Sequence, residues 1–478
     1  MKLSLLNFFL YLLIFFVFSA HVYHYAPHAT DDAFIFYRYV NHIVDGNGIV
    51  WNKGELPVEG FSSPLWIFLL TIGKLFGVPL PIFSLIIGVL SILGTVLIMI
   101  IILNYKSILG LISVAVLLCF GSVYYWSLSG METGLFMLCF LASFVSIHIP
   151  SFRYWVLLLG LTRPEGFLLM IPWSILWARV HPQKRGFIFW AWLPTIVYFL
   201  FRLLYFDAWL PNTYYAKVGA SLLERLGDGF MYATPVLLCL LTIGLTFRSS
   251  IGTLLLSLFM GCTAQVCIVI LGGGDWMTWG RMLVPMFPFI IIMTSIQIAR
   301  GYRFLIVITY FLFPFSTPFA AWPAMIQGKT LPITGFQEGG LYNISKEIAL
   351  DIRKNIPKGA TIAINHAGFL PYLLSDYNFI DMTGLNDRFI AHHAKGGLHQ
   401  KYDVEYVLQR KPELVVFNSF IKPAGKKLSL QYWMGETALY EHPSFLKQYQ
   451  MVPIYYERER FGGGNAYILL FSRYSNTD

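Results

Sequence analysis

Charged residues are scarce in this chain of 478 residues. Only 12% of the residues are Asp, Glu, Lys or Arg, whereas 56% are hydrophobic, and the mean hydropathy is +0.62. An average soluble domain carries about 25% charged residues. The composition therefore excludes an ordinary soluble globular protein and indicates a membrane protein with many spans.

The cysteine pattern of a disulfide scaffold or a zinc site is also missing. All five cysteines lie within apolar segments: Cys119, Cys139, Cys239, Cys262 and Cys267. A free thiol in such a segment behaves as a small hydrophobic group. The sequence contains no internal repeat either, although paired inverted repeats are common in membrane transporters.

A basic surface of the kind that binds nucleic acid is not indicated, although the net charge is +9. The Lys and Arg residues form short clusters between apolar runs, for example at 179–185 and 300–303. Cytoplasmic loops of membrane proteins carry such clusters. We therefore expect the lipid bilayer as a partner and no nucleic acid.

Apolar runs predict about eleven transmembrane helices. A helix needs about 20 residues to cross a bilayer. The runs lie near 3–20, 82–103, 107–126, 132–149, 152–162, 166–179, 187–206, 228–246, 251–271, 283–299 and 303–322. The apolar core of the first run is longer than that of a typical signal peptide, so we expect it to remain as a helix. The shorter piece at 64–76, interrupted by Lys74, predicts a helix at the membrane interface.

From about Trp322 the composition becomes that of a soluble domain. Short β-rich stretches alternate with helical segments, which is an α/β pattern. The β-rich stretches lie at 361–364, 414–417 and 466–471, and the helical segments include 344–355 and 404–410. We therefore expect a membrane domain at 1–322, with its first outer loop at 21–81, and a soluble α/β domain at 323–478.

The orientation follows from the basic clusters. With the N-terminus in the cytoplasm, these clusters fall on the cytoplasmic side. An odd number of spans then places the C-terminal domain on the outer side, together with the first outer loop. The polar motifs that look functional gather on this same side.

An acidic pair, Asp31 and Asp32, opens the first outer loop directly after the first apolar run. Two adjacent carboxylates near hydrocarbon are costly unless they form pairs or take part in chemistry. One of them could cap the helix that begins near Ala33. The second adds repulsion, which tends to raise a carboxylate pKa. We expect at least one of them to act as a general base toward a hydroxyl group.

Three cations, Arg163, Lys217 and Arg281, lie at predicted outer helix ends, where the positive-inside rule does not favour them. Pairing with a neighbouring acid is one explanation, with Glu165 for Arg163 and Asp275 for Arg281. A phosphate group would satisfy all three cations together. Both explanations stay open at this point.

Other features of the outer side are less specific. Trp276 and Trp279 follow a run of three glycines, and interfacial anchoring is the more common role of such residues than stacking on a sugar. Asp31, Asp32 and Glu132 could hold a hard cation such as Mg²⁺ or Mn²⁺, but their spacing does not require one. A metal requirement therefore stays open.

Taken together, the motifs resemble the C-type glycosyltransferase superfamily (GT-C), and more narrowly the mycobacterial terminal arabinofuranosyltransferase family and its bacterial relatives. The matching motifs are DDAFIFYRY, GNGIVWN, VEGFSSPLW, SGMETGLF, LTRPEG, PNTYYAK, GGGDWM and DMTGLND, spread over residues 31 to about 388. Each motif is weak alone, but their shared order makes the signal specific.

The resemblance implies an inverting transferase with a GT-C fold in the bacterial inner membrane. Its donor would be a polyprenyl-phosphate-linked sugar, arabinofuranose or another pentose or hexose, and its acceptor a glycan or lipid of the cell envelope on the periplasmic face. The family further implies a catalytic base at Asp31 or Asp32, with Asp31 ranked first. It also supports Arg163, Lys217 and Arg281 as ligands of the donor phosphate.

Further candidates for substrate binding fall in the same motifs. They are Arg38, Glu59, Glu132, Glu165, Asn212, Tyr214, Asp275 and Trp276. A multi-pass transporter or flippase of lipid-linked sugars is the alternative function. Such a protein would favour inverted repeats and ionisable residues near the bilayer midplane, whereas here these residues gather at one surface.

Overall fold

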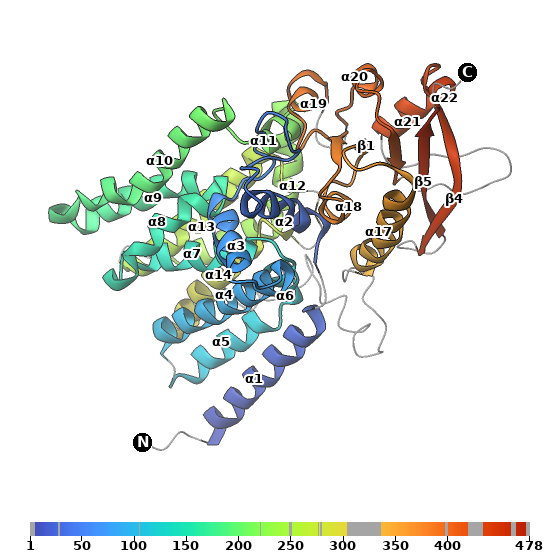
Figure 1. The fold of residues 1–478 in the computed structure, drawn as a ribbon. Coiled ribbons are helices and arrows are strands. Elements are labelled where there is room, and N and C mark those ends of the chain that lie inside the picture. Colours follow the sequence, from blue (N-terminus) through green and yellow to red (C-terminus); the bar gives the residue numbers. More distant parts are fainter. Residues whose placement is uncertain are drawn as a thin grey trace.

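A computed structural model provides the fold of the chain (Figure 1). It describes residues 5–26, 29–104, 106–219, 221–247, 251–275, 277, 280–303, 336–396, 400–418, 434–459 and 465–474. In Figure 1 a helical bundle lies on one side and a β-sheet on the other, with α2 (Asp31–Val44) and α18 (Phe369–Leu373) between them.

The bundle is built from the N-terminal part of the chain. Besides α2, its α-helices are α1 (Leu5–Tyr25), α3 (Pro64–Leu75), α4 (Leu80–Leu103), α5 (Ile108–Leu118), α6 (Gly121–Leu128), α7 (Thr133–Val145), α8 (Val156–Thr162), α9 (Pro164–Val180), α10 (Phe187–Phe206), α11 (Asn212–Lys217), α12 (Leu222–Gly244), α13 (Thr253–Gly272) and α14 (Phe287–Ala299). Short 3₁₀ turns connect several of them, at Pro150–Trp155, Pro182–Lys184 and Val284–Met286.

Within the described residues, five helices are long and apolar enough to cross a membrane, namely α1, α4, α10, α12 and α13. The consecutive helices α5 and α6 could form a sixth span, bent by 58°. Ten of the eleven predicted runs coincide with helices, and the run near 303–322 lies outside the described residues except for Arg303. A membrane protein is thus supported, while the count of eleven spans stays a prediction.

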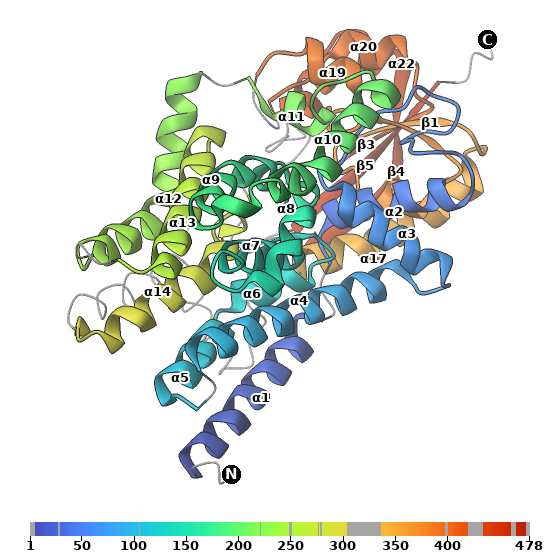
Figure 2. The same ribbon diagram turned by 90° about the vertical axis from the view of Figure 1, so that its left-hand side faces the viewer.

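Packing separates the inner helices from those that face lipid. Every residue of α7 is buried, so this helix occupies the centre of the bundle. By contrast, large apolar side chains are exposed on α1 and α10, for example Phe15 and Leu204. Side chains of this kind suit contact with lipid rather than water. Figure 2 shows α1 extending away from the sheet beside α5.

The C-terminal part forms a mixed five-stranded sheet with helices around it. The strands are β1 (Thr361–Ile364), β2 (Asn378–Asp381), β3 (Leu414–Phe417), β4 (Tyr449–Glu459) and β5 (Asn465–Arg473), in the spatial order β2-β1-β3-β5-β4. The helices are α17 (Phe336–Asn355), α18, α19 (Arg388–His393), α20 (Val404–Gln409), α21 (Met434–Glu441) and α22 (Phe445–Gln448). Parallel pairing joins β2, β1 and β3, and antiparallel pairing joins β3, β5 and β4.

Local sequence explains these strands. Each residue of β3 is buried, which suits a strand covered on both faces. Strand β4 lies at the edge of the sheet, and its register shifts between Met451 and Tyr455, around Pro453. Proline lacks an amide donor and is tolerated at edges and bulges. An α/β arrangement is therefore observed in the described C-terminal residues.

Candidate active site

A cavity lies where α2, the first loop and the C-terminal domain meet. It has a volume of about 650 Å³, including its open mouth. The lining residues come from many elements and are Asp32, Ile35, Phe36, Gly60, Phe61, Ser62, Met131, Glu132, Arg163, Thr213, Lys217, Arg281 and Leu385. Five of the charged residues predicted from the sequence thus share one cavity.

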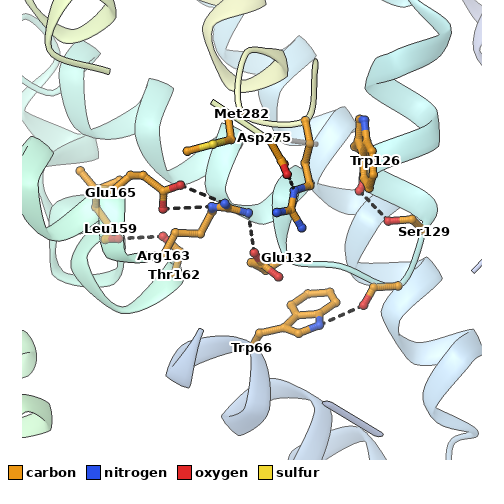
Figure 3. A network of polar contacts seen from close by, with 12 residues as sticks. Trp66, Trp126, Ser129, Glu132, Leu159, Thr162, Arg163, Glu165, Asp275 and Met282 are labelled. Atoms are coloured by element: carbon orange, nitrogen blue, oxygen red, sulfur yellow. Dashed lines mark hydrogen bonds and ion pairs between the residues drawn. The ribbon is translucent and has the colours of Figure 1, made fainter. Parts of the chain in front are cut away.

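Arg163 is the centre of a buried ion-pair network beside this cavity (Figure 3). Its guanidinium lies 2.7 Å from Glu132 Oε1 and 2.9 Å from Glu165 Oε1. Burial opposes the charge on Arg163, but Glu165 and Glu132 outweigh it and raise its pKa. Glu132 Oε2 is buried and has no hydrogen-bond partner among the described residues. One oxygen of the network is therefore free to accept a bond.

Arg281 is paired on one side only. Its Nε donates to Asp275 Oδ2 at 2.8 Å, and its guanidinium lies 5.7 Å from the centre of the Trp126 ring. No residue in the described part of the chain accepts a hydrogen bond from its terminal nitrogens. Burial opposes its charge, yet Asp275 prevails and the pKa of Arg281 is raised. A charged guanidinium with free donors therefore lies at the cavity.

Lys217 is the cation without a direct partner. It ends α11 and lines the cavity, and it makes no ion pair or hydrogen bond with the described residues. The residue is exposed to solvent at the open cavity, but the protein atoms around its ammonium group and the neighbouring Arg281 still lower its pKa, whereas Asp275 and Asp32 act in the opposite direction. An ammonium group with three unused donors suits an anionic ligand.

The two adjacent aspartates have different surroundings. Asp32 lines the cavity, and no described residue donates a hydrogen bond to its carboxylate. Burial raises the pKa of Asp32, while Arg281 and Lys217 oppose that rise. Asp31 instead accepts hydrogen bonds from the backbone amides of Gly368 at 3.0 Å and Phe369 at 2.7 Å. Neighbouring side chains on a helix are about 100° apart, which accounts for this difference.

Arg38 and Glu59 lie in buried contacts outside the lining of the cavity. Arg38 donates to the carbonyl oxygens of Trp51 and Tyr377, both at 2.9 Å. Glu59 lies 2.5 Å from Arg202 Nε and accepts from the Tyr198 hydroxyl. These contacts hold the first loop in place.

The remaining candidates fall into three groups. Glu165 and Asp275 act as partners of the cavity arginines. Asn212 donates to the carbonyl oxygens of Gly384 at 2.8 Å and Leu385 at 3.0 Å, so it supports the cavity wall. Tyr214 is exposed outside the lining, and Trp276 lies outside the described residues.

One wall of the cavity was missed by reasoning from the sequence. Leu385 lies in the motif DMTGLND, which follows β2. Asp381 organises this loop by accepting from Thr383 Oγ1 at 2.6 Å and Asn386 Nδ2 at 2.9 Å. Asn386 in turn packs so closely on Gly60 that a Cβ there would lie 1.8 Å from its Oδ1. The motif was the available signal, but its contact with the first loop is not visible in the sequence.

A divalent cation has no preformed cluster of ligands in the described part of the chain. No group of three or more His, Cys, Asp or Glu residues there could hold a metal ion.

Comparison with known proteins gives one match in sequence and one in structure. A family described as a domain of unknown function, DUF8728, matches residues 336–470. No curated protein matches the chain. The crystal structure of ArnT from Cupriavidus metallidurans bound to undecaprenyl phosphate matches with a TM-score of 0.52 and 12% identity, over 97% of both chains. The likeness to ArnT extends over nearly the whole chain and, at the level of the fold, supports the GT-C fold predicted from the motifs.

Proposed function

We propose that this protein is a membrane glycosyltransferase that moves a sugar from a polyprenyl-phosphate donor to a hydroxyl group of a cell-envelope glycan or lipid. One observation carries the proposal: the unpartnered carboxylate of Asp32 shares a cavity with Lys217 and the partly free guanidinium of Arg281. ArnT, which has a similar fold, was crystallised with undecaprenyl phosphate bound.

Lys217 and Arg281 bind the donor phosphate in this proposal. Both have unused donors at the cavity, whereas the guanidinium of Arg163 is already engaged by two carboxylates. A phosphate leaves with its negative charge, so fixed cations stabilise the transition state without the need for an acid. Arg163 then contributes indirectly, by holding Glu132.

Asp32 acts as the general base. It removes the proton from the acceptor hydroxyl while the oxygen attacks the anomeric carbon and the bond from that carbon to the phosphate oxygen breaks. The geometry favours Asp32 over Asp31, although the family resemblance ranked Asp31 first, because backbone amides bind both oxygens of Asp31. Single displacement of this kind inverts the anomeric carbon.

Glu132 is suited to hold the sugar. Its Oε1 is fixed by Arg163, and its buried Oε2 can accept a hydrogen bond from a sugar hydroxyl. The apolar lining residues Ile35, Phe36 and Phe61 would exclude water from the reacting groups. The sugar is arabinofuranose or another pentose or hexose.

The proposed setting is the bacterial inner membrane, with the cavity and the C-terminal domain on the periplasmic side. Charged residues gather around one cavity near the C-terminal domain, which favours an enzyme at the membrane surface over a transporter with a site at the midplane.

The experiment is sugar transfer from a panel of labelled polyprenyl-phosphate sugars, with purified protein in nanodiscs and a cell-envelope acceptor extract. Transfer by the wild type from one donor, reduced at least about 100-fold in Asp32→Asn, is the expected result. Asp45→Asn is the matched control, because Asp45 is exposed at the other end of α2. Translocation of lipid-linked sugar without any transfer would instead identify a flippase.

A further inference from the structure

Helix α2 has two differently used faces. Asp31, Phe34 and Arg38 are spaced by three and four residues, so they lie on one face. This face contacts α18 of the C-terminal domain. The other face lines the cavity with Asp32, Ile35 and Phe36. One short helix thus joins the C-terminal domain to the proposed reaction site.

The contacts with α18 match the polarity of its backbone. At the N-terminal end of α18, Asp31 accepts from the amides of Gly368 and Phe369. Beyond its C-terminal end, Arg38 donates to the carbonyl oxygens of Leu374 at 3.3 Å and Tyr377 at 2.9 Å. The amides at the N-terminal end of α18 and the carbonyl oxygen of its C-cap residue, Leu374, are groups that a helix leaves unpaired, and Asp31 and Arg38 satisfy them. The bond to Tyr377 adds a contact in the segment that follows the helix.

Apolar and steric contacts complete this junction. Between the two charged residues, the Phe34 ring lies 4.6 Å from the Phe369 ring and 5.1 Å from the Tyr372 ring, measured between centres. Gly368 permits the close approach, because a Cβ there would lie 1.8 Å from the Asp31 carbonyl oxygen. The junction therefore depends on both domains.

A movement of α18 would change the position of one cavity wall through strand β2. The chain runs from α18 into β2, and β2 ends at Asp381, whose carboxylate organises the loop 382–387. That loop contributes Leu385 to the cavity. A displaced α18 would thus withdraw one wall of the proposed site.

We infer that Asp31 is a positioning residue, which together with Arg38 fixes α18 on α2 and thereby keeps the loop 382–387 as a wall of the cavity. Its effect on catalysis rests on the proposed function, but the docking itself does not. In this account Asp31 docks α18 on α2, and Asp32 removes the proton from the acceptor.

The experiment measures hydrogen exchange of the full-length protein in nanodiscs, for the wild type, Asp31→Ala and the matched variant Asp32→Ala. Asp31→Ala is expected to speed exchange in the segments 366–374 and 382–387 by about tenfold or more, since the two hydrogen bonds from the amides of Gly368 and Phe369 are lost. Asp32→Ala should leave both segments unchanged. In sugar transfer, Asp31→Ala should raise the acceptor KM more than it lowers kcat, whereas Asp32→Ala should lower kcat.

A second variant tests the junction from the other domain. Gly368→Ala keeps both aspartates but forces α2 and α18 apart, so it should reproduce the faster exchange of Asp31→Ala. Unchanged exchange in either variant would overturn the inference. So would loss of transfer in Asp31→Ala with exchange as in the wild type, because Asp31 would then act in the reaction. If the wild type transfers no sugar, the proposed function fails, and exchange alone decides the docking role.

Discussion

At the scale of single residues, neighbours in the sequence have separate surroundings. Asp31 and Asp32 share the same helical turn, yet one binds backbone amides of the C-terminal domain and the other faces cations across a cavity. The sequence left open which of the two is the base, and only the tertiary structure shows that their carboxylates have different partners.

The docking of Asp31 should depend on pH. Burial raises its pKa from 3.8 to about 7, aided by Asp32 and Asp381 and opposed by the amides of Phe369 and Gly368. A raised pKa means that docking is most stable at low pH and loses stability as the pH rises toward 7. Exchange at 366–374, corrected for its intrinsic pH dependence, should therefore quicken from about pH 5.5 to about pH 7.5. Asp31→Asn should remove this trend, and a trend that persists would contradict the assignment.

Lys217 should contribute to binding of the donor. Lys217→Met removes an unpaired ammonium from the cavity, and loss of one charge-assisted bond corresponds to about 1.5–3 kcal/mol. The donor KM should rise about tenfold or more in steady-state transfer assays. Lys358→Met is the control, because Lys358 is exposed on the C-terminal domain. An equal effect of both changes would argue against a phosphate site at Lys217.

Arg163 should be needed for stability as well as for the site. Arg163→Met leaves the buried carboxylates of Glu132 and Glu165 without their partner, which should cost about 3–5 kcal/mol. Thermal unfolding in detergent measures the effect. Arg388→Met, which breaks the exposed pair with Asp207, should cost less than about 1 kcal/mol. Similar melting temperatures for the two variants would show that the buried network is not structural.

At the scale of elements, the apolar runs located helices but not their shapes. The run at 107–126 is a single segment by hydropathy, yet it forms α5 and α6 with a bend of 58°. Gly121 and Ser122 follow the break, and such small residues often accompany kinks. Hydropathy records how much of a segment is apolar, and a straight helix and a bent pair do not differ in that respect.

Close packing of helices gives a prediction at this scale. Gly88 in α4 approaches α6, and a Cβ at this position would lie 2.0 Å from the carbonyl oxygen of Ser127. Gly88→Ala should therefore separate the two helices and lower the melting temperature. Gly272→Ala, at the end of α13, meets no atom within 4 Å and should change it little. Equal melting temperatures would contradict the tight contact between α4 and α6.

At the scale of the whole molecule, the sequence predicted the charged residues of the cavity but not the rest of its lining. Asp32 was selected because adjacent carboxylates near hydrocarbon are costly, and Glu132 as a possible ligand of a cation. The cations Arg163, Lys217 and Arg281 were selected because the positive-inside rule does not favour them at outer helix ends. All five residues line one cavity. Of the two explanations for the cations, pairing with neighbouring acids applies in part, and phosphate binding stays a prediction. Acids engage Arg163 fully, engage Arg281 on one side, and leave Lys217 free.

Contacts between the two domains could not be predicted in this way. Substrate binding by Arg38 and Asn212 stays a prediction, and the structure adds that both donate to backbone carbonyls of the C-terminal part of the chain. Leu385 was overlooked because an apolar side chain carries no chemical signal. Such roles depend on tertiary contacts between segments that are far apart in the sequence, for example α2 and α18, which more than 300 residues separate. Local sequence patterns do not determine these contacts.

The turnover numbers of Asp31→Asn and Asp32→Asn, measured side by side with a donor that the wild type uses, test the division of roles most directly. Asp32→Asn should lower kcat at least about 100-fold, because the base is lost. Asp31→Asn keeps one accepting oxygen and should retain more than about a tenth of the wild-type kcat, with its main effect on KM. The reverse order, with Asp31→Asn inactive and Asp32→Asn active, would contradict the account.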